Sequence, residues 1–437
     1  MEIKILIDKI THSQNFRHGM LYTLFSFLNN GISFILVLIL ARFLQPSDYG
    51  QLNLFNTFVT LLNIVISLST ASFVAVSFFS KNKDDIQKII TIVIAVSSSI
   101  SVFLSLLFIC FPKDVENLLG VDIRYLWLGI LICFFSVFNN LNLDIWRLEE
   151  KPVIYGIYSL SFALCNFGLT FWLIVGEKLG WSGRVYAWFL LGLLYFLISI
   201  IFLYKRKYLT LGRPSEALIK ETLLFALPLL PHNVSFWLKQ GADRYIINYF
   251  YDTTVVGYFS FSMNMAAIIT MIVTAFNATN SVYSFKILSA NDAFGLVKLF
   301  TQAKIMTVVF LLVCIGVWGF AFCLIIFGIP KYSNSIPFLV PLCMGAFFQC
   351  IYYLWVNYII FYKKTHKLMM ITLGTAIIQI CLSIWLARFS PLNIAWVSMG
   401  ISALTFILVY FTSHNILKHQ DIMKSLTLYY DNRKNNK

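Results

Sequence analysis

The chain has 437 residues, of which 59% are apolar and only 12% are charged, about half the charged share of an ordinary soluble domain. Its formal net charge is +14, but the basic residues lie between long apolar runs, which indicates a membrane topology and no nucleic-acid partner. These runs approach about 20 residues and do not alternate in polarity, so the composition excludes both a soluble globular domain and an outer-membrane β-barrel.

Apolar spans follow one another along the chain and predict an all-α polytopic membrane protein of about 12 transmembrane helices. No cleavable signal is expected, because residues 1–19 mix acidic with basic residues and lack a separate apolar core. The spans are expected at residues 20–42, 53–79, 89–111, 125–146, 153–175, 184–204, 221–248, 254–283, 304–327, 335–361, 368–388 and 393–413.

Lys and Arg are distributed unequally among the connections between these spans. One set of alternate segments holds 24 of them and the other set holds 7. The richer set comprises residues 1–19, 80–88, 147–152, 205–220, 284–304, 362–367 and 414–437. Because cytoplasmic loops carry the excess of Lys and Arg, both termini are expected in the cytoplasm.

The two halves of the chain resemble each other. An offset of 202 residues aligns Ser33, Leu36 and Arg42 with Ser235, Leu238 and Arg244. An offset of 213 aligns Lys151, Leu160 and Ala163 with Lys364, Leu373 and Ala376. These matches predict two six-helix lobes, residues 1–205 and 221–413, joined by a basic linker at 206–220 and followed by a basic tail at 414–437. Six spans is an even number, so the axis relating the lobes should run along the membrane normal, with the substrate site at their interface.

The predicted seventh span carries an unusual density of polar residues. Pro228 and Pro231 should kink or break its helix near the middle. One helical face then carries four polar residues in succession, and Arg244 lies on the adjoining stripe. These four are His232, Ser235, Lys239 and Asp243. Such a face is too polar to contact lipid and predicts a hydrated cavity.

Three other spans carry asparagines that we expect in the same cavity. They are Asn30 in the first span, Asn63 in the second and Asn277 in the eighth. The alternative is that these amides only join helices by hydrogen bonds, as small polar residues do in many membrane bundles.

Charged residues inside spans are stronger candidates, because a cation near the bilayer centre costs at least roughly 2.5–3.5 kcal/mol. Lys239 is therefore a candidate substrate ligand. Arg244 either faces the cavity or reaches the outer interface from the end of its helix. Asp243 is either a site for a coupling proton or cation, or the structural ion-pair partner of Lys239 four residues away.

Enzyme and cofactor signatures are absent from the sequence. It contains no HExxH motif and no phosphate-binding glycine-rich loop, and its eight cysteines show no metal-ligand spacing. The prediction is a protein without catalytic residues, cofactor or metal, and any transport is not driven by an ATPase of its own.

Several segments resemble those of a known family. Ala41–Gly50, with its Arg42, Pro46 and Tyr49-Gly50, is similar to a characteristic motif after the first span of polysaccharide transporters, and Ala242–Ile247 resembles its counterpart in the seventh span. Gly180–Arg184 gives a further match. The chain thus resembles the polysaccharide transporters of the multidrug, oligosaccharidyl-lipid and polysaccharide flippase superfamily, and O-antigen flippases in particular.

The resemblance implies a flippase of the bacterial cytoplasmic (inner) membrane. Its substrate would be an oligosaccharide repeat unit on undecaprenyl diphosphate, moved from the cytoplasmic to the outer leaflet by alternating access, for O-antigen or another surface polysaccharide. Lys239, Arg244 and Arg17 would attract the diphosphate. Membrane lipid, a polysaccharide polymerase and a chain-length regulator would be its further partners.

Two rival functions remain open at the level of sequence. A cation-coupled multidrug exporter of the same superfamily would share the fold, but its cavity should favour carboxylates over Lys and Arg. A membrane polysaccharide polymerase or acyltransferase would be an enzyme, and the polymerase should have a large outer loop. No outer connection here is longer than about Pro112–Arg124.

Overall fold

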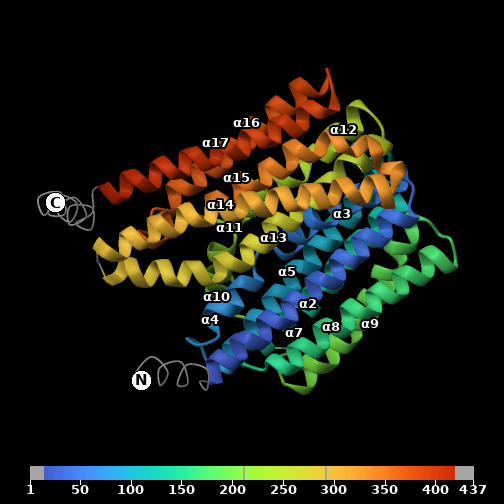
Figure 1. The fold of residues 1–437 in the computed structure, drawn as a ribbon. Helices are drawn as coiled ribbons and strands as arrows, with labels where there is room; N and C mark the ends of the chain where they lie inside the picture. The colour runs from blue at the N-terminus through green and yellow to red at the C-terminus, as the bar shows by residue number, and fades with distance from the viewer. Residues whose placement is uncertain (1–13, 210–211, 291–292, 419–437) are drawn as a thin grey trace, which may run out of the picture. The chain divides into compact units, whose positions relative to one another are not determined.

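The protein is described by a computed structural model, which covers residues 14–209, 212–290 and 293–418 (Figure 1). Every regular element in these ranges is a helix. The chain divides into two compact units, residues 1–234 and 235–437. The first unit contains α2 (Gln14–Phe43), α3 (Pro46–Ser67), α4 (Ala71–Ser77), α5 (Lys83–Cys110), α6 (Pro112–Leu119), α7 (Ile123–Leu148), α8 (Pro152–Phe171), the π-helical turn η1 (Trp172–Gly176), α9 (Trp181–Lys205), α10 (Glu216–Ala226) and the first half of α11 (Leu229–Gln240).

The second unit begins within α11 and is also helical throughout its described residues. It contains α12 (Ala242–Phe250), α13 (Thr253–Ala290), α14 (Ala293–Cys323), the π-helical turn η2 (Leu324–Gly328), the 3-10 helix η3 (Pro330–Ser335), α15 (Ile336–Phe361), α16 (Thr365–Ala387) and α17 (Pro391–Lys418).

Eleven helices of the described residues are long and apolar enough to cross a membrane, and they match eleven of the twelve predicted spans. The predicted seventh span, 221–248, is not among them. It is divided into α10, α11 and α12, of 11, 12 and 9 residues, none of which could cross a bilayer by itself. The multi-pass helical membrane fold is therefore confirmed, with eleven of the predicted spans found as long helices and the predicted seventh span divided among three short ones.

In the first unit, alternate connections meet at opposite ends of the bundle. At one end, Lys83 Nζ donates to Arg206 O at 3.3 Å and Tyr208 Oη donates to Glu149 Oε1 at 2.6 Å. At the other end, the rings of Tyr125 and Trp181 lie 4.5 Å apart. This alternation is what successive crossings of a membrane require.

The second unit shows the same alternation. At one end, the apolar cluster that contains Leu288, Leu296 and Leu417 joins the connections that follow α13 and α15 to the end of α17. At the other end, Tyr251 Oη donates to Ala387 O at 2.7 Å. The predicted order of crossings therefore agrees with the packing within each unit.

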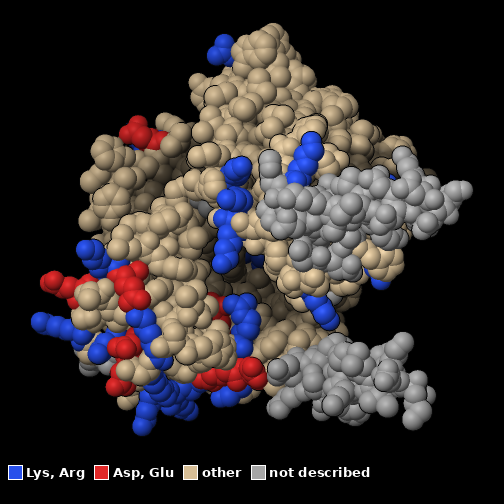
Figure 2. Space-filling view, turned by 90° about the vertical axis from the view of Figure 1, so that its left-hand side faces the viewer, with Lys and Arg blue, Asp and Glu red and all other residues tan. Residues whose placement is uncertain are grey.

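Large apolar side chains cover much of the outer surface, as lipid contact requires. Phe27, Phe79 and Phe327 are 68%, 77% and 84% exposed. Charged side chains gather at the ends of helices. Figure 2 shows Lys and Arg, with fewer Asp and Glu, on the side at which the first described residues of α2 lie.

Two of the crossings in the first unit are interrupted. Between α3 and α4, Leu68 and Ser69 have φ of 43° and 58°, which L-residues adopt only with strain. The Thr70 hydroxyl donates to Ser67 O at 2.6 Å and so competes with the helical hydrogen bonds there. Between α10 and α11 the helix stops at Leu227 and Pro228, where the proline has no N–H to donate.

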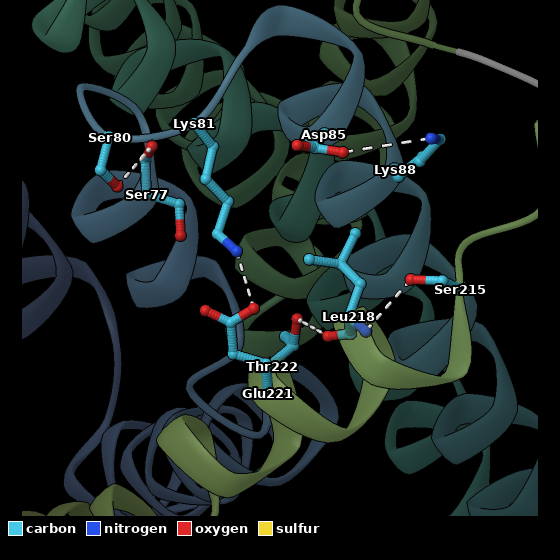
Figure 3. Close-up of polar contacts among 9 residues, drawn as sticks. All are labelled: Ser77, Ser80, Lys81, Asp85, Lys88, Ser215, Leu218, Glu221 and Thr222. Atoms are coloured by element: carbon cyan, nitrogen blue, oxygen red, sulfur yellow. Dashed lines mark hydrogen bonds and ion pairs between the residues drawn. The ribbon is translucent and has the colours of Figure 1, made fainter.

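Contacts hold the segments on either side of these two interruptions together. Lys81 Nζ lies 2.7 Å from Glu221 Oε2, between the end of α4 and α10 (Figure 3). Asn233 Nδ2 donates to Ser69 Oγ at 2.8 Å. Because of these contacts, α10 and the start of α11 belong to the first unit, whereas the sequence placed the boundary earlier, at the linker 206–220.

Candidate functional site

The second interruption of the seventh crossing lies at Gly241, between α11 and α12. A helix end leaves carbonyl groups without intrahelical donors, and inside a membrane these must be satisfied by the protein. Gln379 Nε2 of α16 donates to Lys239 O at 3.0 Å, and Arg244 Nη1 donates to Gln240 O at 2.9 Å. The break is therefore a stable, internally satisfied feature of the fold.

The break also places two charges at opposite helix ends. Lys239 lies in the last turn of α11 and Asp243 in the first turn of α12. A helix C-terminus stabilises a cation and a helix N-terminus stabilises an anion, each by about 0.3–1 kcal/mol at exposed positions and more where water is scarce. Each charge therefore has a favourable helix dipole beside it without needing the other.

The ammonium group of Lys239 is held by two threonines. Its Nζ donates to Thr375 Oγ1 at 2.6 Å and to Thr405 Oγ1 at 3.1 Å, and the two hydroxyl oxygens are 3.1 Å apart. Each hydroxyl also donates along its own helix, to Ile371 O and Ile401 O. The side-chain nitrogen thus has uncharged oxygen acceptors from α16 and α17.

Asp243 has partners of its own. It is fully buried, and its carboxylate accepts hydrogen bonds from Gln379 Nε2 at 2.9 Å and Ser383 Oγ at 3.0 Å. Among the ion pairs of the described residues, none joins Lys239 to Asp243. The structural ion pair considered from the sequence is therefore not formed, because the break separates the two residues onto different short helices.

Lys239 lines a cavity of about 140 Å³ within the second unit. One part of the wall is polar and comes from α11, α16 and α17, and the rest is largely apolar and comes from α13 and α15. Among the described residues, no carboxylate lines this cavity and Lys239 is the one charged lining residue. The polar part includes Ser235, Lys239, Thr372, Gln379, Ser398, Ser402 and Thr405, and the apolar part includes Met263, Ala266, Ala267, Leu342 and Ala346.

The other predicted site residues do not line this cavity. Arg244 is 9% exposed and bonds to Ser260 Oγ as well as to Gln240 O, so it supports the break between α11 and α12. Asn277 accepts from Asn357 Nδ2. In the first unit, Asn63 accepts from Ser136 Oγ and Asn30 is exposed on α2. The side chain of Arg17 lies outside the described residues.

Several residues of the site were missed by the sequence analysis. Thr372, Thr375, Gln379 and Ser383 follow at intervals of three or four along α16, which is the same stripe pattern that singled out the seventh span. The signal was present, but their side chains are uncharged and resemble ordinary helix-joining residues.

Comparison with known proteins finds a family and sequence relatives for about three fifths of the chain. The profile of a family described as polysaccharide biosynthesis protein matches residues 16–283. A protein of the Lsg locus of Haemophilus influenzae is 23% identical over 283 residues, which cover 62% of this chain and 66% of that protein. An uncharacterized membrane protein of the same organism is 24% identical over 265 residues, 58% of this chain and 61% of that one. The matched region thus spans slightly less than two thirds of each relative.

Solved structures of transporters share the fold. An inward-facing multidrug resistance MATE family transporter of the MOP superfamily matches with a TM-score of 0.70 at 15% identity, over 91% of this chain and 95% of that one. The lipid II flippase MurJ, in an inward closed conformation, matches with a TM-score of 0.65 at 15% identity, over 90% and 87% of the two chains. At such identities the likeness concerns the fold alone.

Proposed function

We propose that this chain, which belongs to the polysaccharide biosynthesis protein family, is a flippase that moves an oligosaccharide linked to an isoprenoid diphosphate across the cytoplasmic membrane of a bacterium. The observation that carries the proposal is the cavity whose one charged lining residue is a cation, Lys239. An ammonium group between hydroxyls and amides suits a phosphate oxygen, which accepts charge-assisted hydrogen bonds.

The wall of the cavity also suits an amphipathic substrate. Its polar part can hydrogen-bond a phosphate and the first sugar, while its apolar part lies on α13 and α15. An isoprenoid tail can remain in lipid while the head group crosses, so the protein needs to provide a polar environment for the head group only. O-antigen and other repeat units of surface polysaccharides fit this description.

Transport of such an anion can draw on the membrane potential. A substrate with two negative charges is driven outward by an inside-negative potential and releases roughly 2.3 kcal/mol per charge for each 100 mV. Alternating access of the bundle would then complete the cycle. A polysaccharide polymerase and a chain-length regulator are the expected partners on the outer side.

The multidrug-exporter alternative fits the cavity less well. An exporter of cationic drugs needs a carboxylate that the drug can reach, and the carboxylate nearest in sequence to Lys239, that of Asp243, is fully buried and hydrogen-bonded. A cation entering beside Lys239 would meet a like charge. Drug efflux by the purified protein, without movement of lipid-linked sugar, would favour this alternative.

The direct test is translocation by the purified protein. Reconstituted into liposomes, it should expose a fluorescent isoprenyl-diphosphate sugar on the opposite leaflet faster than empty liposomes do, and it should neither hydrolyse nor polymerise that lipid. Chain growth would instead place the protein among the polymerases, and no movement of the lipid would overturn the proposal.

We further propose that both termini are cytoplasmic, because the richer set of Lys and Arg lies on their side. Reporter fusions after residues 84, 212 and 437 should report the cytoplasm, and fusions after residues 118, 180 and 331 the outer side. Reversal of two neighbouring fusions would contradict this orientation.

A further inference from the structure

A second cation lies inside the crossing helices of the first unit. Arg184 is in the first turn of α9, and its Nη1 donates to Asn166 Oδ1 at 2.6 Å and to Thr170 Oγ1 at 3.0 Å. Its guanidinium carbon is 5.4 Å from the centroid of the Trp188 ring. Among the ion pairs of the described residues none involves Arg184, although the Asp48 carboxylate approaches the same loop at Gly180.

The electrostatics of this position are unfavourable without an anion. The first turn of a helix carries a partial positive charge, which repels a cation placed there. Neutral oxygens such as those of Asn166 and Thr170 satisfy hydrogen bonds but do not cancel the charge. With a like charge from the helix end beside it and only neutral acceptors, the guanidinium gains from a negative ligand.

The guanidinium also presents a suitable edge for such a ligand. Only Nη1 donates to a described residue; Nε and Nη2 form no hydrogen bond within the described part of the chain. Neither is among the buried unpartnered atoms, so each keeps some accessible area although the side chain as a whole is only partly exposed. Together these two nitrogens form the fork that binds two oxygens of one phosphate group.

The internal repeat gives an independent comparison. The offset of 213 residues that aligns α8 with α16 places Asn166 on Gln379 and Thr170 on Ser383. In the second unit this pair holds the Asp243 carboxylate, whereas in the first unit it holds the Arg184 guanidinium. Equivalent positions therefore bind a built-in anion in one unit and present a cation without one in the other.

We propose that Arg184, positioned by Asn166 and Thr170, is a second anion site that binds a phosphate or diphosphate group. That this group belongs to the lipid-linked sugar rests on the proposed function; a phosphate of an ordinary anionic lipid has the same chemistry. The site lies in the first unit and is separate from the Lys239 cavity, which is lined by the second unit alone.

Binding stoichiometry tests the proposal. The full chain, in nanodiscs of phosphatidylcholine, is titrated calorimetrically with inorganic diphosphate, and two sites per chain are expected. Arg184→Gln should remove one, with affinity there falling at least about tenfold, and Arg184→Lys should retain a weakened site. Arg124→Gln is the matched control, because Arg124 is exposed and already paired with Asp122.

Two further variants keep the outcome decisive. Asn166→Asp should remove the same site without loss of thermal stability, because a carboxylate beside Nη1 replaces the external anion. Lys239→Met should remove only the other site. An unchanged stoichiometry in both Arg184→Gln and Asn166→Asp would overturn the second site. An unchanged stoichiometry in Lys239→Met would count against the proposed function instead.

The source of the phosphate is decided by the lipid and by the ligand. If lipid head groups occupy Arg184, nanodiscs containing phosphatidylglycerol should show one diphosphate site in the wild-type protein. If the site serves the transported substrate, farnesyl diphosphate should still bind at two sites in those nanodiscs. Both results support an anion site at Arg184. A single diphosphate site in every lipid, unchanged by Arg184→Gln, would refute it.

Discussion

Replacing Lys239 by methionine removes the ammonium group but keeps most of the aliphatic side chain. The structure predicts that the variant folds. Two charged hydrogen bonds are lost, at about 1.5–3 kcal/mol each, but the burial of a charge, worth roughly 2.5–3.5 kcal/mol, is relieved. Thr375 and Thr405 keep their bonds to Ile371 O and Ile401 O, so no polar group is left unsatisfied. These terms place the net change in the free energy of unfolding between a gain of about 0.5 kcal/mol and a loss of about 3.5 kcal/mol.

The effect on transport should be larger. A charge-assisted hydrogen bond to a phosphate contributes about 1.5–3 kcal/mol, which corresponds to roughly 10- to 150-fold in affinity. In the liposome assay, Lys239→Met should raise the substrate concentration for half-maximal rate by that factor, while Lys239→Arg should keep most of the activity. Lys88→Met is the control, because Lys88 is exposed and pairs with Asp85, three residues before it on the same helix.

A Lys239→Met protein with normal membrane levels and wild-type kinetics would refute the role of Lys239 in substrate binding. The double variant Lys239→Met, Asp243→Asn separates charge balance from binding. Because the Asp243 carboxylate is bonded to Gln379 and Ser383 and not to Lys239, neutralising it should not restore transport. Full activity of the double variant would show that Lys239 only balances Asp243.

Two further predictions concern stability. Gln379→Leu leaves Lys239 O and one carboxylate oxygen of Asp243 without a donor, so it should lower the free energy of unfolding by about 2–5 kcal/mol. The control Gln349→Leu, in the same cavity, should lower it much less. Equal loss of thermal stability in the two variants would contradict the capping role of Gln379. The pKa of Glu149 is below its ordinary value of 4.5, since burial, which raises it, is outweighed by bonds from Tyr208 and Lys151 and by the charge of Arg206. The ionised Glu149 carboxylate therefore stabilises the fold at neutral pH, and this stabilisation is lost as the pH falls below about 4.5. The difference in melting temperature between the wild type and Glu149→Gln should accordingly shrink on acidification. A difference that does not depend on pH would contradict this role of Glu149.

The order and type of the helices could be predicted because apolar runs of membrane length are a strong signal. The residues at which the helices begin and end could not always be predicted. The second crossing begins at Pro46, seven residues before the predicted start, although Pro46 at the first helical position and Asp48 in the first turn are both helix-start signals. Hydropathy outweighed these local signals in the prediction, since Ser47, Asp48 and Asn53 lower the hydropathy of this segment.

The site was predictable only in part. Lys239 stood out because a charge inside a span is rare. Its threonine partners did not, because Thr375 and Thr405 are distant in sequence and only the packing of α16 and α17 against α11 brings them together. The same limit applied to Arg184, whose place near a predicted loop concealed its partners on α8.

The divided seventh crossing has a consequence for how the chain enters the membrane during synthesis. α10, α11 and α12 are short and carry Lys239, Asp243 and Arg244, so this segment should partition poorly into lipid by itself. If it were skipped, every later helix would insert upside down and the basic segments after residue 283 would lie outside. If the orientation proposed above holds, we expect the positive charges of those later segments to favour insertion of the seventh segment, which would then be completed only after the following helices are synthesised.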